Sequence, residues 1–560
     1  MIPGSMSRRR LLQAGATAPL IPAGFAQAQV PRTSPGITYE TSVADIRAGY
    51  ENDEFSIAEF TEASLRRIAQ LDGADTWLAA MIETNPDALD IAQLLDEERK
   101  AGIVRGPMHG LPVVVKDVFA TADRMQTTAG SLSMEGTRAS RDAFIVQRMR
   151  EAGMVILGKS NLTEWSGFRP TLYGWSPRGG LSANPYVTSQ TTWGSSSGSA
   201  AAVAASYVPV SVGVETDGSI LCPASACGVV GIKPTVGVTS RQGGIGNGYT
   251  LDSPGVMGRT VADAAELLSV IAGLDPRDIA YGDHADHFPA GLDFATQVHM
   301  PGQRDYARAI AEGGLQGARI GVVRAYWGVD SEADRHAENA LAALQDAGAE
   351  LVEDIFPEGL SALEGSFMAS ETMGIEFPGL IQRFLDDYAP DSEVKSLADI
   401  IGWYESHPEE SDWAWENDAL SLSLWSSEEW DEQHIAWIEE MHAAARTRGI
   451  DAVMEEYEVD ALVAPTSALP TRWDNTSYFW ASTQLSASAG YPSVTIPIGY
   501  TEGVPAGLHF FGPAFTERRL IRFAAELERT LQARTAPQFL ETTDYDDIYA
   551  PLPVYEDEVD

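Results

Sequence analysis

Three short apolar runs, each almost free of polar side chains, constrain the fold of this chain more than any other feature. They are Leu111–Val115, Met154–Leu157 and Val208–Val214. Strands buried on both faces of a sheet carry continuous apolar runs of this kind, whereas half-exposed strands alternate apolar and polar residues. Helical segments at 141–153 and 199–205 separate the runs. This alternation predicts an α/β fold whose core surrounds one large sheet.

Two helical regions flank this core. In the first, residues 37–100, Ser42 and Ser56 each stand three positions before an acidic residue, as in the capping boxes that begin helices. The second region, 335–458, is acidic and rich in tryptophan. Six of its tryptophans stand at positions 403, 413, 415, 425, 430 and 437. Tryptophans at helical spacing either pack helices together or line an apolar pocket, and the sequence leaves both open. The core is predicted to resume over 459–534.

Charge and cysteine content exclude several classes of protein. The 560 residues include 80 acidic and 38 basic side chains, which gives a net charge of −42. A surface this acidic repels phosphate backbones and anionic lipids, so we expect no nucleic-acid partner. Residues 541–560 form an acidic tail, predicted to extend over the surface. The only cysteines are Cys222 and Cys227, too few for a cysteine zinc cluster or a disulfide framework.

The N-terminus resembles an export signal. Arginines at 8–10 are followed by the weakly apolar stretch 11–25 and by Ala26-Gln27-Ala28. That is the order of a signal peptide with a small-residue cleavage site, and Ser-Arg-Arg-x-Leu-Leu resembles a twin-arginine signal. We predict a signal peptide over 1–28, with 1–5 as an upstream extension, and an exported, periplasmic protein. After the signal, no apolar run reaches the ~18 residues of a membrane helix, so no membrane anchor is expected. A merely basic tail would instead leave the protein in the cytoplasm.

Several short motifs match known expressions but lack the structural context. Gly153–Ser160 fits the phosphate loop G-x4-G-K-S, yet Met-Val-Ile-Leu between its glycines predicts a strand rather than a phosphate-binding turn. The S-x-x-K motif at 392–395 lies in an acidic segment without its companion motifs. His284 and His287 lack a third metal ligand. We therefore predict neither a metal nor a nucleotide site.

A fourth motif leaves an alternative open. Gly194–Gly198 fits the nucleophile elbow G-x-S-x-G, which would make Ser196 the nucleophile of an esterase with a Ser-Asp-His triad. The residues before it, 184–193, make a poor strand, and none of the nine histidines is an obvious partner.

Three further segments agree with one another. Lys116 ends the first buried run, where desolvation lowers the pKa of an amine and makes it a usable general base. A turn rich in glycine and serine, 194–199, precedes a run of alanines that predicts a helix. In 214–220, the Gly218-Ser219 pair follows a buried strand, where successive backbone N–H groups can converge as in an oxyanion hole.

Together these segments closely resemble the amidase signature family, and most of all its peptide amidase branch. The resemblance rests on Gly194-Ser-Ser-Ser-Gly-Ser, Glu215-Thr-Asp-Gly-Ser-Ile-Leu-Cys-Pro-Ala and Gly228-Val-Val-Gly-Ile-Lys-Pro-Thr. It implies one large domain over 29–540, with core motifs in 110–260 and the Trp-rich helices as a variable insertion. The implied fold is a central mixed β-sheet covered by helices on both faces.

The resemblance also implies a Ser–Ser–Lys triad. Ser219 would be the nucleophile, Ser195 would relay its proton after a cis peptide bond at Gly194, and Lys116 would be the neutral base. The implied oxyanion hole consists of the backbone N–H groups of Thr216, Asp217, Gly218 and Ser219. The implied substrate contacts are Trp165, Ser166, Gly167 and Ser196. The sequence departs from the usual family text at Ser197, at Asp217 and at Leu221, and Asp217 adds negative charge unless it is hydrogen-bonded into the turn.

The expected activity is hydrolysis of carboxylic or peptide amides through an acyl-enzyme, without a cofactor or metal. Esterase or carbamate hydrolysis by the same triad, the Ser196 esterase, a phosphate-loop NTPase that uses Lys159 and a non-catalytic binding protein stay as alternatives. Expected substrates are C-terminal peptide, aryl or fatty amides, and the charge favours neutral or cationic ones. Export would separate the chain from tRNA, which disfavours a role within a tRNA-linked amidotransferase. The expected assembly is a monomer or a homodimer.

Overall fold

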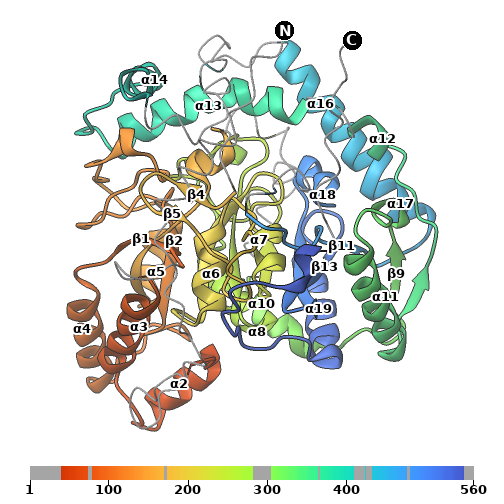
Figure 1. Ribbon diagram of the computed structural model, residues 1–560, viewed down its shortest axis with the longest axis horizontal. Helices are drawn as coiled ribbons and strands as arrows, with labels where there is room; N and C mark the ends of the chain where they lie inside the picture. The colour runs from red at the N-terminus through yellow and green to blue at the C-terminus, as the bar shows by residue number, and fades with distance from the viewer. Residues whose placement is uncertain are drawn as a thin grey trace.

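The computed structural model describes a sheet of eleven strands flanked by helices (Figure 1). The structure describes residues 39–72, 78–169, 173–281, 285, 304–363, 366, 368–408, 420, 423, 432–473, 475 and 480–547. Across the sheet the strands are β1 Met81–Thr84, β3 Val155–Ser160, β2 Pro112–Lys116, β6 Val210–Glu215, β8 Ser253–Gly258, β7 Val230–Lys233, β12 Ser493–Thr501, β13 Val504–Phe511, β11 Ala461–Pro465, β9 Arg319–Val322 and β10 Glu350–Val352. A separate small hairpin pairs β4 Trp175–Ser176 with β5 Gly180–Leu181.

The α-helices are α2 Val43–Glu51, α3 Ile57–Leu71, α4 Ala88–Lys100, α5 Phe144–Glu151, α6 Ser197–Ala204, α7 Leu221–Ala226, α8 Val261–Ile271, α10 Tyr306–Ala309, α11 Ser331–Asp346, α12 Leu360–Leu363, α13 Met368–Asp387, α14 Leu397–Ser406, α16 Glu432–Ala445, α17 Asp451–Glu456, α18 Gln484–Ala489 and α19 Glu517–Leu531. Short 3₁₀ turns are η1 Leu132–Met134, η2 Glu164–Gly167, η3 Ile279–Tyr281, η6 Ile310–Glu312, η7 Arg324–Tyr326 and η11 Asp544–Asp547, and η9 Arg446–Ile450 is a π turn.

The three apolar runs become neighbouring strands in the first half of the sheet. Strand β2 lies between β3 and β6 and is parallel to both, so their carboxyl ends meet at one edge. All residues of the three strands are buried, as continuous apolar runs predict. Further along, β6 with β8 and β12 with β13 pair antiparallel, which makes the sheet mixed. This confirms the predicted fold class.

Helices cover the sheet in two groups. Helices α6 and α7 contact each other and the strands around β6 and β7. Helices α8, α19 and α11 form a second layer, in which α19 contacts both of the others. The expected capping boxes are present: Ser42 caps α2 and Ser56 caps α3, each with its partner acid at the third helical position.

Figure 1 shows α13 and α14 across the top of the molecule, away from α2, α3 and α4. Together with α16 they belong to the described part of the Trp-rich region, which is helical as predicted. Trp413, Trp415, Trp425 and Trp430 lie outside the described residues. Trp403 stacks on His407 with ring centroids 4.1 Å apart. This contact lies within one short stretch of chain.

Two expectations need correction. The region 37–100 is not wholly helical, because Met81–Thr84 forms β1 and pairs antiparallel with β3. The tail that begins at 541 does not simply extend over the surface. Its Tyr545 is buried, and the Tyr545 hydroxyl donates a hydrogen bond to Asp330 at 3.2 Å. Packing of this aromatic ring outweighs the acidic character of its neighbours in the sequence.

Three predictions concern residues that the structure does not describe. The signal peptide at 1–28, the His284–His287 pair and the end of the tail at 548–560 lie outside the described residues. Within the residues that are described, none of the helices combines the length and apolar character needed to cross a membrane. The same residues contain no group of three His, Cys, Asp or Glu side chains placed to hold a metal.

Candidate active site

A buried lysine lies at the carboxyl end of β2. The Lys116 side chain has no exposed surface, and its Nζ donates a hydrogen bond to Ser195 Oγ at 2.7 Å. Burial lowers the pKa of Lys116 to about 7, although the negative charges of Asp252 and Glu215 oppose this shift. A large fraction of this amine is therefore neutral near pH 7, and the neutral amine can accept a proton across the same contact.

The serine that contacts Lys116 precedes helix α6. The peptide bond between Gly194 and Ser195 is cis. The carbonyl of Ser195 accepts a hydrogen bond from the Thr163 N–H at 3.0 Å, and the next residue, Ser196, donates its N–H to the Ser219 carbonyl at 3.1 Å. This second bond joins the Ser195 segment directly to the turn that carries Ser219.

Ser219 lies in the turn between β6 and α7, where 8% of its surface is exposed. Gly218 adopts a φ of 75°, the left-handed conformation that glycine tolerates best. The Glu215 carboxylate accepts hydrogen bonds from the N–H groups of Ile220 and Leu221 at 2.8 and 2.9 Å. Glu215 thereby satisfies two N–H groups at the start of α7 and holds the turn in place.

The N–H groups of residues 216–219 are free of this network. Within the described part of the chain, none of these four groups donates a hydrogen bond. The structure thus places unpaired backbone donors on both sides of Gly218 and next to the Ser219 hydroxyl. An arrangement of this kind can stabilise an oxyanion.

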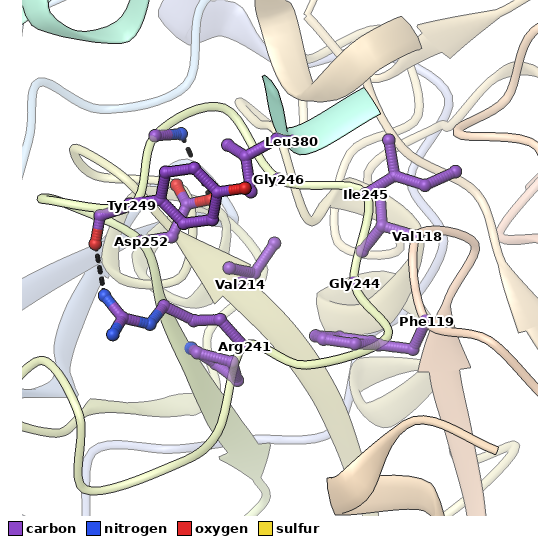
Figure 2. A pocket seen from close by; sticks show the side chains of 12 residues that line it. Val118, Phe119, Val214, Arg241, Gly244, Ile245, Gly246, Tyr249, Asp252 and Leu380 are labelled. Carbon is purple, nitrogen blue, oxygen red and sulfur yellow. Dashed lines mark hydrogen bonds between the residues drawn. The ribbon is translucent and has the colours of Figure 1, made fainter. Parts of the chain in front are cut away.

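Asp252 connects this turn to a neighbouring loop. Its carboxylate accepts hydrogen bonds from Thr216 Oγ1 at 2.7 Å and from the N–H groups of Asn247 and Gly248. Burial raises the pKa of Asp252 to about 6. Figure 2 shows Asp252 at the side of a small cavity, where Tyr249 overlies it in this view. The apolar wall of this cavity, which includes Val214, explains why the carboxylate loses water.

Ser219 lines a larger cavity, which has a volume of about 410 Å³. Its lining residues come mainly from three places: the loop at and after η2, the β6–α7 turn with Asn247, and the first turns of α13. They are Ser166, Gly167, Phe168, Thr216, Asp217, Ser219, Asn247, Ser370, Glu371, Met373, Gly374, Ile375 and Ser423. A cavity of this size accommodates a small acyl group or a short peptide end.

The loop at one side of this cavity rests on a buried polar cluster. The Tyr404 hydroxyl, on α14, donates to Glu164 and accepts from Trp165 Nε1 at 2.9 Å. Arg169 pairs with Glu164 at 2.6 Å, and its guanidinium lies 3.9 Å from the centre of the Tyr404 ring. Helix α14 thus holds the loop that carries Ser166.

Two of the predicted substrate contacts need correction. Trp165 is 1% exposed and does not line the cavity, because its indole N–H points at Tyr404. Ser196 is wholly buried, and its hydroxyl donates to the Val214 carbonyl at 3.2 Å. Ser166 and Gly167 do line the cavity, and the Ser166 hydroxyl is buried without a hydrogen-bond partner among the described residues.

The competing motifs occupy structural positions. Lys159 lies inside β3 and donates to the Phe119 carbonyl and to Thr127, so the phosphate-loop match is a strand.

Cys222 and Cys227 are buried free thiols. Asp217 does not hydrogen-bond back into its own turn, because its carboxylate accepts from Thr483 at 2.6 Å.

Sequence reasoning does not reveal the side chains that support the site from a distance. Glu215 and Asp252 stand inside family motifs, yet nothing in those motifs indicates which N–H groups they bind. Tyr404 and the α13 residues fall in the variable region, where no motif points to them. Contacts such as Trp165 to Tyr404, which are 239 positions apart, have no local signal.

Comparisons with known proteins agree with this geometry. The amidase family model matches residues 59–521. A probable amidase of Arabidopsis thaliana is 36% identical over 511 residues, which cover 90% of this chain and 92% of the plant protein. A subunit of the glutamyl-tRNA(Gln) amidotransferase from Salinispora arenicola is 34% identical, over 89% of this chain and 98% of that protein.

Solved structures give the same result. The native peptide amidase from Stenotrophomonas maltophilia is 38% identical, with a TM-score of 0.81, over 89% of this chain and 99% of that enzyme. A second structure of the peptide amidase, in complex with the competitive inhibitor chymostatin, is 39% identical, with the same TM-score of 0.81 and the same coverage. The chain therefore belongs to the amidase signature family and is a hydrolase of amides.

Proposed function

We propose that this chain hydrolyses C-terminal amides of peptides and related carboxylic amides through a triad of Ser219, Ser195 and Lys116. One observation carries the proposal. Lys116 Nζ, excluded from water at the end of β2, lies 2.7 Å from Ser195 Oγ, and the Ser195 segment is hydrogen-bonded to the turn of Ser219. A base of lowered pKa within hydrogen-bonding reach of a serine hydroxyl favours activation of a serine nucleophile, and Lys116 meets this condition at Ser195.

The first half of the reaction forms an acyl-enzyme. Ser219 Oγ attacks the amide carbonyl carbon while its proton passes to Ser195 Oγ, and the Ser195 proton passes to neutral Lys116. The carbonyl oxygen becomes an oxyanion, which the free N–H groups of 216–219 stabilise by about 3 kcal/mol per donor. The C–N bond then breaks, and the leaving nitrogen takes a proton that returns from Lys116 through Ser195.

Water completes the cycle. A water molecule attacks the Ser219 ester, gives a proton to the same relay, and releases the carboxylic acid with regeneration of the Ser219 hydroxyl. Lys116 is again neutral at the end, so no net proton accumulates on the enzyme. This chemistry involves only side chains and backbone of this chain.

Two observations support peptide amides as the substrate class. The peptide amidase structures are similar over 89% of this chain. The cavity next to Ser219 combines apolar walls with polar groups, a combination that suits a peptide group of the substrate. Esters would be cleaved by the same route, because an alkoxide leaves more readily than an amide nitrogen.

The decisive experiment measures ammonia release from N-acetyl amino acid amides by four purified variants. Ser219→Ala and Lys116→Ala should lose activity by a factor of about 10³ or more, since each removes a member of one catalytic unit. Ser195→Ala should behave similarly. Ser196→Ala is the matched control, because it removes a neighbouring hydroxyl that is buried away from the cavity.

The Ser196→Ala control also distinguishes the proposed triad from the alternative esterase, in which Ser196 would be the nucleophile. If Ser196→Ala abolished turnover and Lys116→Ala retained it, the triad proposed here would be wrong. Circular dichroism of each variant should match the parent protein, so that loss of activity reports chemistry rather than unfolding.

We further propose that the protein acts after export. The support is the sequence Ser7-Arg8-Arg9-Arg10-Leu11-Leu12 followed by Ala26-Gln27-Ala28. Bacterial cells that make the full chain should contain active enzyme in the periplasmic fraction, beginning near Gln29. Replacing Arg8 and Arg9 with lysine should retain the protein in the cytoplasm. If the parent chain and the lysine variant were divided in the same way between periplasm and cytoplasm, the proposal would be wrong.

A further inference from the structure

The described residues that line the cavity next to Ser219 carry ionisable side chains of one sign only, which is negative. Among the described residues that line it, the only ionisable side chains are Asp217 and Glu371, and none is Lys, Arg or His. The two carboxylates come from different elements, the β6–α7 turn and the first turn of α13. In a chain with a net charge of −42, this cavity therefore presents a negative field to a substrate.

Glu371 is available to a ligand. It is exposed in the cavity, and no described residue donates a hydrogen bond to its carboxylate or forms an ion pair with it. Its position in the first turn of a twenty-residue helix stabilises the negative charge through the helix dipole. Met373 and Ile375 line the same cavity nearby and supply apolar contacts for the stem of a side chain.

Asp217 lines the same cavity from a different element, the β6–α7 turn. One of its carboxylate oxygens accepts from Thr483 at 2.6 Å, which fixes the orientation of the group. The second carboxylate oxygen has no hydrogen-bond partner among the described residues. Asp217 is exposed and lines the cavity. The cavity thus has carboxylates at two separate places in its wall, and its apolar side chains come from helix α13 and Phe168.

Resting on the proposed amidase function, we propose that Glu371, assisted by Asp217, makes this enzyme selective for amides whose acyl part carries a positive charge. A cation in the cavity would pair with the exposed carboxylate of Glu371, whereas an acidic acyl group would be repelled by both. The cation has two possible sources: a basic side chain next to the amide, or the terminal ammonium of a short peptide amide.

The experiment compares two pairs of substrates, and the members of each pair differ in charge. N-acetyl-arginine amide and N-acetyl-citrulline amide differ in charge but hardly in size, and glycyl-leucine amide differs from N-acetylglycyl-leucine amide in its terminal ammonium. The parent enzyme should favour the charged member of at least one pair in kcat/KM by about fivefold, the effect of one solvent-exposed ion pair. The pair that shows the preference identifies the source of the cation.

Two isosteric variants locate the effect. Glu371→Gln should abolish the preference, whereas Glu405→Gln removes one charge at an exposed position of α14 outside the cavity lining and should retain it. Equal kcat/KM within both pairs in the parent enzyme would overturn the inference, as would an unchanged preference in Glu371→Gln. Failure of the amidase proposal itself looks different: citrulline amide would release no ammonia, or Ser219→Ala would still cleave it.

Discussion

At the scale of single residues, the proposed role of Lys116 as the base predicts the pH dependence of the reaction. The base must be neutral, and the pKa of Lys116 is lowered to about 7 by burial. We expect kcat/KM to fall as pH decreases through about 7, because Lys116 then takes up a proton. Asp252→Asn should shift the midpoint of this profile to lower pH, since it removes a negative charge that favours the ammonium form.

This shift separates two roles of Asp252. A purely structural role in holding Asn247 and Gly248 would lower kcat/KM at every pH without moving the midpoint. A profile with an unmoved midpoint in Asp252→Asn would therefore contradict the electrostatic role. The measurement is kcat/KM for one neutral amide over the full pH range in which both proteins stay folded.

The same lysine costs stability. Between about pH 7 and 10.5 the unfolded chain binds a proton at Lys116 that the folded chain does not, so the free energy of unfolding rises with pH in this window. We expect Lys116→Met to be inactive but more stable than the parent by about 2–4 kcal/mol near neutral pH. The gain should shrink as pH rises. Urea unfolding at two pH values tests this, and a destabilised variant at neutral pH would contradict it.

At the scale of elements, α14 supports the loop that carries Ser166 through the Tyr404 hydroxyl. Tyr404→Phe would leave Trp165 Nε1 without its acceptor and would remove one of the two donors to Glu164, which would keep Arg169, within a buried cluster. We expect the free energy of unfolding to fall by about 2 kcal/mol and KM to rise more than kcat falls, because the loop carrying Ser166 loosens.

Tyr388→Phe is the matched control for this prediction. The Tyr388 hydroxyl is buried without a hydrogen-bond partner among the described residues, so its removal should leave stability and KM nearly unchanged. Equal effects of the two substitutions would show that the Tyr404 network does not hold the loop. Chemical denaturation and Michaelis–Menten kinetics provide both readouts.

Some helices and strands can be predicted from the sequence and others cannot. The strands β2, β3 and β6 follow from short continuous runs, and the caps of α2 and α3 follow from Ser42 and Ser56, because these signals act within a few residues. Strand β1 escapes prediction because it is short and lies between helices. The lining of the cavity by α13 depends on packing between segments over 150 positions apart, for which the local pattern carries no information.

At the scale of the whole molecule, the net charge of −42 acts against the folded state. Like charges crowd together on folding, and salt screens their repulsion. We expect the midpoint of thermal unfolding to rise by several degrees between about 0.1 M and about 1 M sodium chloride, where the screening length falls from ~10 to ~3 Å. Scanning calorimetry measures this rise. A midpoint that falls over this range would show that the attractive ion pairs outweigh the repulsion.

The position of β2 and β6 inside an eleven-stranded sheet has a consequence for how the enzyme fails on warming. Lys116 and the Ser219 turn are attached to strands with neighbours on both sides, so they are displaced only when the whole sheet melts. The α13 wall of the cavity is part of a helix that contacts α14 and α16 and is not continuous with a strand, so we expect it to shift while the sheet is intact. Heated enzyme should thus lose its ability to discriminate between substrates before it loses its ability to cleave them.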